Sequence, residues 1–406
     1  MLVRISWRNI WRNKVRSLVV ILAIAIGLTG GVFLTGLMNG MVAQQTSSTI
    51  NNQISEIQIH HPDFGDNMNP EYLIDHVEQK SQTIRQNDQV TEITYRSKSS
   101  AMASTATTGA GIVINGIIPE KEKKVTTIHE NIIDGTYFEN DAYSSPMVLG
   151  QKLAHKLRTE IGNKVVITLQ SNTGEMASNL FRVVGIYKTN DTRFDEMQLF
   201  VNYSDLNDML GISAGQANEI AIRTVSKEVA PEAAASLQDE FRDLKVQSWR
   251  ELKPSLIVVM TMMDQFGYWL MVIILFALIF GIVNTMLMVI LERKRELGML
   301  MSVGMNKTRV FKMIMLETTM LSLVGGAIGL GISILLMGIF GNTGINFASW
   351  AEGLEAMGYS SFVYPYVTPG FYAGVTVLVI VTAIIASIWP TRKALKMNPA
   401  DAVRSE

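Results

Sequence analysis

Residues 292–312 read ERKRELGMLMSVGMNKTRVFK and separate two long apolar runs, 266–291 and 313–340. Six of these twenty-one residues are lysine or arginine. Because lysine and arginine beside membrane spans are retained in the cytoplasm, the segment predicts a short loop on the cytoplasmic side. Its charge fits two interpretations: a solvated loop that only fixes topology, or a docking helix for a cytoplasmic partner.

The apolar residues of this loop predict a short amphipathic helix. Leu297, Leu300 and Met301 recur at helical spacing. Gly304 can end that helix in a left-handed conformation, and Asn306 can cap the next one. The loop is therefore expected to hold a helix, a turn and the start of a second helix.

The composition points to a protein that is partly embedded in a membrane. Apolar residues make up 48% of the 406 residues, and charged residues only 17%. The 35 basic and 36 acidic residues give no overall attraction to nucleic acid. The chain has no cysteine, which excludes disulfides and thiolate metal sites.

The amino-terminal region predicts a helix on the membrane surface followed by a span. Residues 1–16 combine five basic residues with an apolar face and two tryptophans, as interfacial helices do. The run 17–38 is uncharged and no small-x-small cleavage site follows it, so it predicts an uncleaved anchor. The polar stretch 44–53 lacks proline and glycine. The helix can therefore continue to a length of about 50 Å, beyond a hydrocarbon core of about 30 Å, as a stalk.

Glycines spaced four apart permit close contact between membrane helices. Three such helix-packing pairs occur in the apolar runs: Gly27 and Gly31, Gly36 and Gly40, and Gly325 and Gly329.

Residues 54–250 predict a soluble α+β domain, because alternating strand patterns and short helical patterns follow one another there. We interpret 54–119 together with 212–250 as one subdomain, and 120–211 as a second subdomain inserted into it. No catalytic constellation is recognisable in this region.

Three local patterns in this domain lead to specific expectations. Asn69-Pro70 predicts the start of a helix that ends near Gln86. His60 and His61 could form a ligand pair, although the exposed end of a strand is the favoured interpretation. One loop predicts a solvated acidic turn rather than a metal site, through Asp191, Asp195 and Glu196.

The remaining apolar runs complete a topology with four spans. The loop 292–312 and both chain ends carry excess cations, so they are expected inside, and 54–250 outside. The predicted segments are a surface helix (1–16), a first span and stalk (17–53), the outer domain (54–250), a stalk and second span (254–291), the coupling loop (292–312), a third span (313–340), an outer loop (341–369), a fourth span (370–389) and a cytoplasmic tail (390–406).

The sequence argues against a solute path or an ATP site within this chain. The middles of the four spans contain no ionisable residue that could relay protons or ions. The stretch 304–308 has Lys-Thr after glycine but lacks the full phosphate-binding motif. A large outer domain, two stalks and a basic inner loop are more typical of a mechanical transmitter than of a channel.

The chain resembles permeases of the ABC transporter family that includes MacB, LolC, LolE and FtsX. The loop is similar to the family pattern E-R-x-x-E-[IL]-G-x-L-x-A-x-G, although Ser302 stands where alanine is usual. WRNIWRNKVRS near the amino end, VLGQKLA in the outer domain and WPTRKALKMNPADAVR in the tail are also similar to family motifs. The residues that match the loop pattern are Glu292, Arg293, Glu296, Leu297, Gly298, Leu300 and Gly304.

The resemblance implies a noncatalytic permease in a bacterial inner membrane, with both termini in the cytoplasm. It implies that the matching loop residues form a coupling helix on an ATPase, which binds the ATP and magnesium that this chain does not. It also implies a dimer with a second identical or paralogous permease chain. Because Met1 precedes the first span by only sixteen residues, we expect the ATPase to be a separate subunit.

Two kinds of function remain open within this family. The stretch TGLMNGM (35–41) echoes lipoprotein-releasing permeases, which favours lipoprotein release with a lipoprotein and a periplasmic carrier as partners. MacB-like export of a hydrophobic or peptide substrate is the alternative transport function. FtsX-like regulation of a cell-wall hydrolase, in which nothing is transported, is the alternative of a different class.

Overall fold

The computed structural model describes residues 2–12, 14–65, 68–139 and 144–395. These residues form two compact units. The helical unit comprises Met1–Val42, Met260–Asn346 and Phe362–Glu406, and the sheet unit comprises Ala43–Val259 and Phe347–Ser361. Residues 396–406 of the predicted tail lie outside the described residues.

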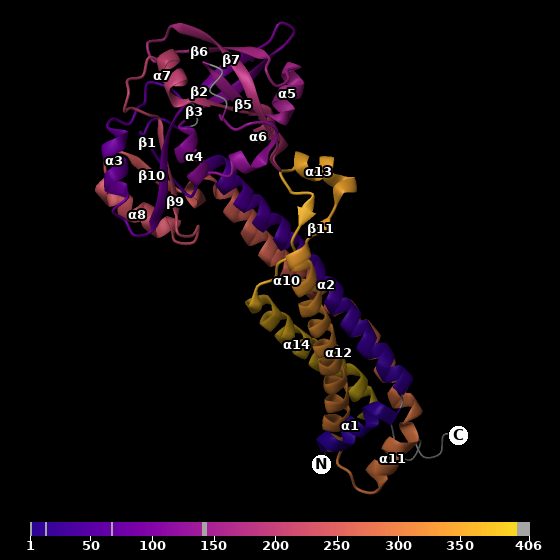
Figure 1. Ribbon diagram of the computed structural model, residues 1–406. Coiled ribbons are helices and arrows are strands. Elements are labelled where there is room, and N and C mark those ends of the chain that lie inside the picture. The colour runs from indigo at the N-terminus through magenta and orange to yellow at the C-terminus, as the bar shows by residue number, and fades with distance from the viewer. Residues whose placement is uncertain (1, 13, 66–67, 140–143, 396–406) are drawn as a thin grey trace. The chain divides into compact units, whose positions relative to one another are not determined.

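The helical unit is built around long apolar helices (Figure 1). Among the described residues, four helices are long and apolar enough to cross a membrane, with mean hydropathies between 2.3 and 2.7. The elements are α1 (Leu2–Arg12), α2 (Lys14–Thr49), α10 (Pro254–Glu292), α11 (Lys294–Ser302), α12 (Lys307–Thr343), α14 (Pro369–Leu395) and the short strands β11 (Ile345–Asn346) and β12 (Phe362–Val363).

The two helices that contain residues of both units, α2 and α10, are far longer than a bilayer requires, and so is α12 with 37 residues. The first candidate span runs over 41 residues, Lys14–Ile54, because the π-helix η1 (Ile50–Ile54) continues α2. At 1.5 Å per residue it is about 60 Å long, twice a hydrocarbon core of about 30 Å. The helix α10 has 39 residues and begins at Pro254, where proline fits the first turn. Both helices include residues of the two units.

Close backbone approach shapes the packing of the helical unit. A Cβ atom on Gly329 would lie 2.8 Å from the carbonyl oxygen of Ala25, and one on Gly40 would lie 2.2 Å from that of Tyr364. A side chain at either position would therefore force the backbones apart. The other glycines of the predicted pairs also face neighbours: Gly27 faces Leu278, Gly31 faces Met271, Gly36 faces Met337 and Gly325 faces Ile24.

The helix α14 extends beyond the predicted end of the fourth span at residue 389. We expected the span to stop at Trp389-Pro390, but α14 extends through Pro390 to Leu395. Proline removes one backbone N–H donor. The hydroxyl of Thr391 donates to the carbonyl of Ser387, one turn back, and so supplies a hydrogen bond beside this position.

The sheet unit is organised by one mixed sheet of ten strands (Figure 1). The order is β10-β1-β9-β2-β3-β8-β5-β7-β4, and β6 pairs with β2 and β7. The strands are β1 (Ile57–His60), β2 (Val90–Ser104), β3 (Gly109–Ile117), β4 (Ile132–Gly135), β5 (Pro146–Gly150), β6 (Lys164–Gln170), β7 (Met176–Tyr187), β8 (Gln198–Asn202), β9 (Glu219–Thr224) and β10 (Lys245–Ser248).

The sheet unit also contains short helices, most of which connect these strands. They are α3 (Val77–Ile84), α4 (Pro119–Val125), η2 (Ile128–Asn131), α5 (Gln151–Leu157), α6 (Thr192–Met197), α7 (Tyr203–Leu210), α8 (Ala230–Glu240), α9 (Trp249–Leu252), η3 (Ala348–Trp350) and α13 (Ala351–Ala356). The last two belong to the predicted outer loop 341–369, of which Phe347–Ser361 is part of the sheet unit.

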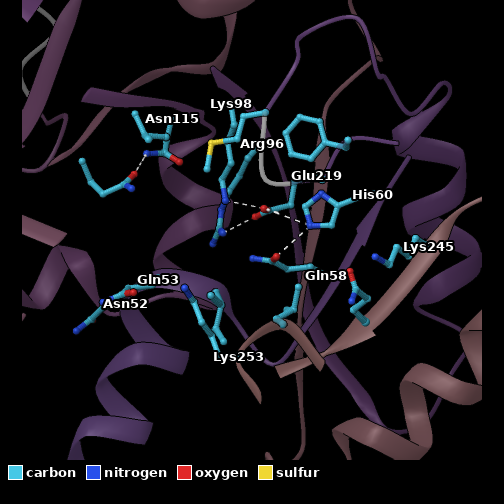
Figure 2. A pocket seen from close by; sticks show the side chains of 18 of the residues that line it. Asn52, Gln53, Gln58, His60, Arg96, Lys98, Asn115, Glu219, Lys245 and Lys253 are labelled. Carbon is cyan, nitrogen blue, oxygen red and sulfur yellow. Dashed lines mark hydrogen bonds and ion pairs between the residues drawn. The ribbon is translucent and has the colours of Figure 1, made fainter. Parts of the chain in front are cut away.

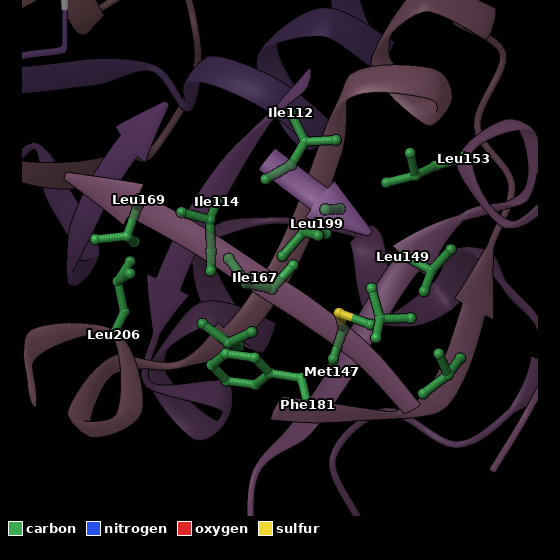
Figure 3. Packing of buried hydrophobic residues seen from close by; sticks show 14 of the residues in the cluster. Ile112, Ile114, Met147, Leu149, Leu153, Ile167, Leu169, Phe181, Leu199 and Leu206 are labelled. Atoms are coloured by element: carbon green, nitrogen blue, oxygen red, sulfur yellow. The ribbon is translucent and has the colours of Figure 1, made fainter. Parts of the chain in front are cut away.

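The long strand β2 joins the two halves of the sheet. Its first part pairs with β9, and its second part pairs with β3 and β6. Ile112 and Ile114 of β3 consequently pack in one core with Met147, Phe181 and other residues of the predicted insertion 120–211 (Figure 3). The core around that insertion is thus completed by strands from outside the predicted range.

The helix predicted from Pro70 begins only at Val77, so that prediction is wrong. The Asn69 side chain accepts a hydrogen bond from the backbone N–H of Glu71, which forms a local turn. Ile74 then pairs with Ala217 as an isolated β-bridge, with backbone hydrogen bonds of 2.8 and 3.2 Å. A side-chain turn and a long-range bridge therefore override the helical signal of Asn-Pro.

Candidate functional site

The loop between α10 and α12 folds as its sequence predicts. The helix α11 covers Lys294–Ser302, and Gly304 has a φ of +99° in the turn that follows. The Asn306 side chain accepts a hydrogen bond of 3.1 Å from the backbone N–H of Thr308 and so caps α12. The helix, the glycine turn and the asparagine cap are all confirmed.

One face of α11 is buried in the helical unit. Leu297 is 3% exposed, Gly298 is buried, and Leu300, Met301 and Met305 pack against the same apolar core. The predicted coupling residues Leu297 and Gly298 therefore hold α11 in place within its own chain.

The opposite face of α11 is open. Met299 is 57% exposed, and Val303, which directly follows α11, is 87% exposed. Arg295 is also exposed and precedes Met299 by one helical turn. A groove of about 350 Å³ adjoins this face, with Ile5 and Met313 in its lining. The sequence pattern marked Leu297 and Leu300, and it missed this exposed apolar face.

Ion pairs tie α11 to the amino-terminal helix. Nη2 of Arg12 donates to both carboxylate oxygens of Glu296, over 2.7 and 2.8 Å. Nε of Arg293 donates to the same carboxylate over 3.0 Å, and its Nη1 donates to Glu317 over 3.0 and 3.1 Å. A continuous chain of charges therefore connects α1, α11 and α12.

A separate ion pair joins α2 and α10. Both terminal nitrogens of Arg16, in the first turn of α2, donate to the Glu292 carboxylate at the end of α10. A pocket of about 330 Å³ lies among these charged groups. Glu292, Arg293 and Glu296, which the sequence assigned to a partner, thus bind groups of their own chain.

The burial of these groups differs along the network. The Glu317 side chain is 8% exposed and the Arg293 side chain 14%, whereas that of Glu296 is 44% exposed. Hydrogen bonding from Arg12 lowers the pKa of the Glu296 carboxyl, with a second contribution from Arg293, so this carboxylate is ionised at neutral pH. Glu317 closes the network, and no local motif marked it in the sequence.

The amphipathic helix α1 is held on the helical unit by a buried contact. The Ser6 hydroxyl donates to the carbonyl of Met313 in α12 over 3.1 Å, and Ile10 is 2% exposed. Trp7 and Trp11 remain 44% and 43% exposed. Amphipathic tryptophans in such positions are typical of a helix at a membrane interface.

The histidine pair considered as a ligand site in the sheet unit is not arranged to bind a metal ion. His60 ends β1 as predicted, but it is buried and its Nε2 lies 3.7 Å from Glu219, so the favoured interpretation of an exposed histidine is wrong. Burial lowers the pKa of the His60 imidazole. Among the described residues, no group of three or more histidine, aspartate or glutamate side chains is arranged to hold a metal ion.

Asp195 corrects the expectation of a solvated acidic turn. It is 2% exposed and accepts hydrogen bonds from the backbone N–H and the hydroxyl of Thr189. Burial raises the pKa of its carboxyl to about 7. Asp191 caps α6 through the N–H groups of Arg193 and Phe194, and Glu196 pairs with Lys156.

Comparison with known proteins identifies the family. The family described as MacB-like periplasmic core domain matches residues 17–240, more than half of the chain, and FtsX-like permease C-terminal matches residues 268–399. This chain belongs to the ABC transporter permeases of the MacB, LolC and FtsX type. The permease is a membrane protein, with four apolar helices and a mixed α/β domain as predicted.

Two relatives resemble the permease over most of its length. An uncharacterized ABC transporter permease of Methanocaldococcus jannaschii is 28% identical over 292 residues, which is 68% of this chain and 66% of that protein. The lipoprotein-releasing system transmembrane protein LolC of Neisseria meningitidis is 24% identical over 307 residues, which is 73% of this chain and 74% of LolC. The extracellular domain of the transporter YknZ from Gram-positive bacteria is 19% identical, with a TM-score of 0.33, over 48% of this chain and 99% of that domain.

Proposed function

We propose that the permease is the noncatalytic membrane subunit of an ATP-driven complex that releases lipoproteins from the cytoplasmic membrane. A separate ATPase subunit binds ATP and magnesium and docks on residues 292–312. A second permease chain completes the complex. The docking loop and both chain ends face the cytoplasm, because cations concentrate there.

The two-sided arrangement of α11 carries the proposal. One face is fixed by buried Leu297 and by the ion pairs of Glu296, while Met299 and Val303 are exposed on the other. Exposed apolar side chains beside a groove are typical of a protein-binding surface. The ATPase is the occupant that an ABC permease requires at a basic inner loop.

Displacement of α11 has a direct route along the chain. The Arg16–Glu292 pair and the Arg293–Glu317 pair connect α11 and its neighbours to α2, α10 and α12. The helices α2 and α10 each continue into residues of the sheet unit. Because a continuous hydrogen-bonded helix is stiff along its axis, movement at one end is transmitted to the other. This mechanical transmission needs no solute path through the membrane.

We favour lipoprotein release because a lipoprotein-releasing relative aligns with most of this chain. LolC of Neisseria meningitidis, a lipoprotein-releasing system transmembrane protein, aligns with 73% of the permease and over 74% of its own length. A lipoprotein and a periplasmic carrier would then be partners of the outer domain.

Purification of the tagged permease from native membranes after mild cross-linking tests this function. We expect an ATPase together with lipoproteins or a lipoprotein carrier among the proteins identified by mass spectrometry. An ATPase with a cell-wall hydrolase, or with a small-molecule export partner, would contradict lipoprotein release. Recovery without any ATPase would contradict the coupling function itself.

A further inference from the structure

A pocket of about 450 Å³ opens in the sheet unit beside the end of the first long helix (Figure 2). Its lining includes Asn52 and Gln53 of η1, and Lys253, which directly precedes α10. The strands β1, β2, β3, β8, β9 and β10 together supply more than half of the remaining lining residues. This volume lies in the range of small-molecule binding sites.

A buried ion cluster forms one wall of the pocket. Arg96, which is 2% exposed, donates to Glu122 through Nε and Nη2 and to Glu219 through Nη1, over 2.6 to 3.0 Å. Lys98 donates to the other oxygen of Glu219. Burial alone would raise the pKa of Glu219, but the charges of Lys98 and Arg96 lower it to about 2. The cluster is therefore ionised, internally paired and rigid.

Two further lysines carry charge that this cluster does not neutralise. Lys245 of β10 and Lys253 are exposed and line the pocket. Within the part of the chain that the structure describes, neither forms an ion pair. Glu251, the remaining acid in the lining, is engaged by the backbone N–H and the hydroxyl of Ser248. The pocket thus presents two ammonium groups to an incoming ligand. Figure 2 shows Lys245 and Lys253 at different parts of the lining.

Carboxamide side chains surround these charges. Gln58 contacts His60 at 3.0 Å, and the amide nitrogen of Asn115 donates to Gln198 over 2.8 Å. Each carboxamide carries both a donor and an acceptor, so this lining matches the hydroxyl or amide groups of a polar ligand. Phe194 and Phe200 add apolar surface to the same pocket.

The backbone beside the pocket is strained. The segment η1 is a π-helix, and Ser55 directly after it has φ 64° and ψ −177°, a region that is almost confined to glycine. The Ser55 hydroxyl holds this conformation by donating to the carbonyl of Ile222 over 2.6 Å. Strain of this kind is concentrated at functional sites, which independently singles out this end of the first helix.

We propose that the pocket binds a small organic carboxylate that also carries hydroxyl or amide groups. Lys245 and Lys253 attract the carboxylate, and the carboxamides hold the neutral polar groups. This binding site is independent of ATP hydrolysis and of the cargo of the complex. Because η1 contributes to the lining, an occupied pocket also contacts the end of the helix that begins at α2.

Calorimetric titration of the full permease in detergent tests this proposal. The probes are glucuronate and glucose, which share a hydroxylated ring but differ in the carboxylate, and inorganic phosphate as a simple anion. We expect glucuronate to bind with a Kd of about 1 mM and glucose to bind at least about tenfold more weakly. The double variant Lys245→Gln/Lys253→Gln should weaken glucuronate binding by about tenfold or more.

Lys152→Gln provides the matched control, because Lys152 is an exposed lysine of α5 outside this lining. Unchanged binding by that variant, with loss in the double variant, supports the proposal. An absence of glucuronate binding to the unmodified permease at about 10 mM would overturn it. Equal binding of glucose, stronger binding of phosphate, or unchanged affinity in the double variant would also overturn it. All the substituted lysines are exposed, so thermal unfolding should confirm that each variant is folded.

Discussion

Arg16 and Glu292 form a bidentate ion pair that joins the first turn of α2 to the last residue of α10. These helices are the two that include residues of both compact units. The pair therefore fixes the ends of both long helices next to α11, where the proposed ATPase docks. We propose that this pair acts in coupling, because an exposed ion pair is expected to add little to stability.

Charge reversal at this pair should uncouple ATP hydrolysis from release. Glu292→Arg places two cations together and should reduce ATP-dependent release severalfold in reconstituted vesicles while the complex still assembles. The exchanged pair Arg16→Glu/Glu292→Arg restores the attraction and should recover much of the release. Equal defects in the single and exchanged variants would mean that the pair itself has no role.

Removal of one partner of the Arg293–Glu317 pair should lower the free energy of unfolding more than removal of any other charge in the network. Arg293→Met leaves the Glu317 carboxylate, 8% exposed, without its partner and should cost about 3 kcal/mol of unfolding free energy. Arg293→Met/Glu317→Met removes both charges and should be more stable than the single variant. Thermal unfolding in detergent measures both, and a double variant that is less stable than the single one would contradict the prediction.

The exposed face of α11 should be required for assembly with the ATPase. Val303→Glu introduces a charge at a residue that is 87% exposed, so the fold should be retained while ATPase recovery falls by about tenfold. Val225→Glu is the matched control, because Val225 is 68% exposed in the sheet unit. Quantified co-purification of the ATPase decides this prediction, and equal recovery with both variants would count against docking on this face.

Close packing at Gly329 should make it intolerant of a methyl group. A Cβ there would lie 2.8 Å from the Ala25 carbonyl oxygen, whereas one on Gly338 of the same helix meets nothing within 4 Å. Gly329→Ala should therefore lower the Tm by several degrees, and Gly338→Ala should leave it unchanged or raise it. The opposite order of the two melting temperatures would show that α2 and α12 are not in this contact.

Asp195 should make the stability of the sheet unit fall as the pH rises towards 7. Its pKa is raised from 3.8 to about 7, so the folded protein retains a proton that the unfolded chain loses. The stabilisation is full below about pH 4 and is lost as the pH rises through about 7. Glu219 acts in the opposite direction only below about pH 4.5, since its pKa is lowered to about 2.

Denaturant unfolding between about pH 4.5 and 7 measures this effect. Relative to Asp195→Asn, the unmodified permease should lose a few kcal/mol over the interval, because the opposite contribution of His60, whose pKa is lowered, is present in both proteins. Asp195→Asn cannot ionise and should have a flatter profile, with the exposed Asp208→Asn as the control. Parallel profiles for all three proteins would refute the assignment to Asp195.

The sequence predicts the membrane helices and the loop well because their signals are local. Uninterrupted apolar runs define four helices, and Gly304 and Asn306 mark the ends of helices within a few residues. The charge network was missed because Arg12 and Glu296 are 284 positions apart, and nothing in either neighbourhood identifies the other. The family pattern also assigned Glu292 and Glu296 to a partner. A sequence motif does not tell whether a carboxylate binds an arginine of its own chain or a group of another protein.

Long-range contacts explain the errors in the sheet unit as well. The helix expected at Pro70 was replaced by a turn and by the bridge between Ile74 and Ala217, which no local pattern indicates. Asp195 lies in a polar stretch that is typical of an exposed loop, yet packing of the surrounding helix and strands buries it. The pocket wall of Arg96 and Glu219 likewise forms only when β2 and β9 pair.

Photo-cross-linking from position 303 tests most directly whether the loop 292–312 couples an ATPase to the permease. A photoreactive amino acid replaces Val303 in native membranes, and the same substitution at Val225 serves as the control. We expect an ATPase subunit to be captured from position 303 and not from position 225. Capture from neither position, while an ATPase still co-purifies with the permease, would show that the ATPase docks elsewhere than on the loop 292–312.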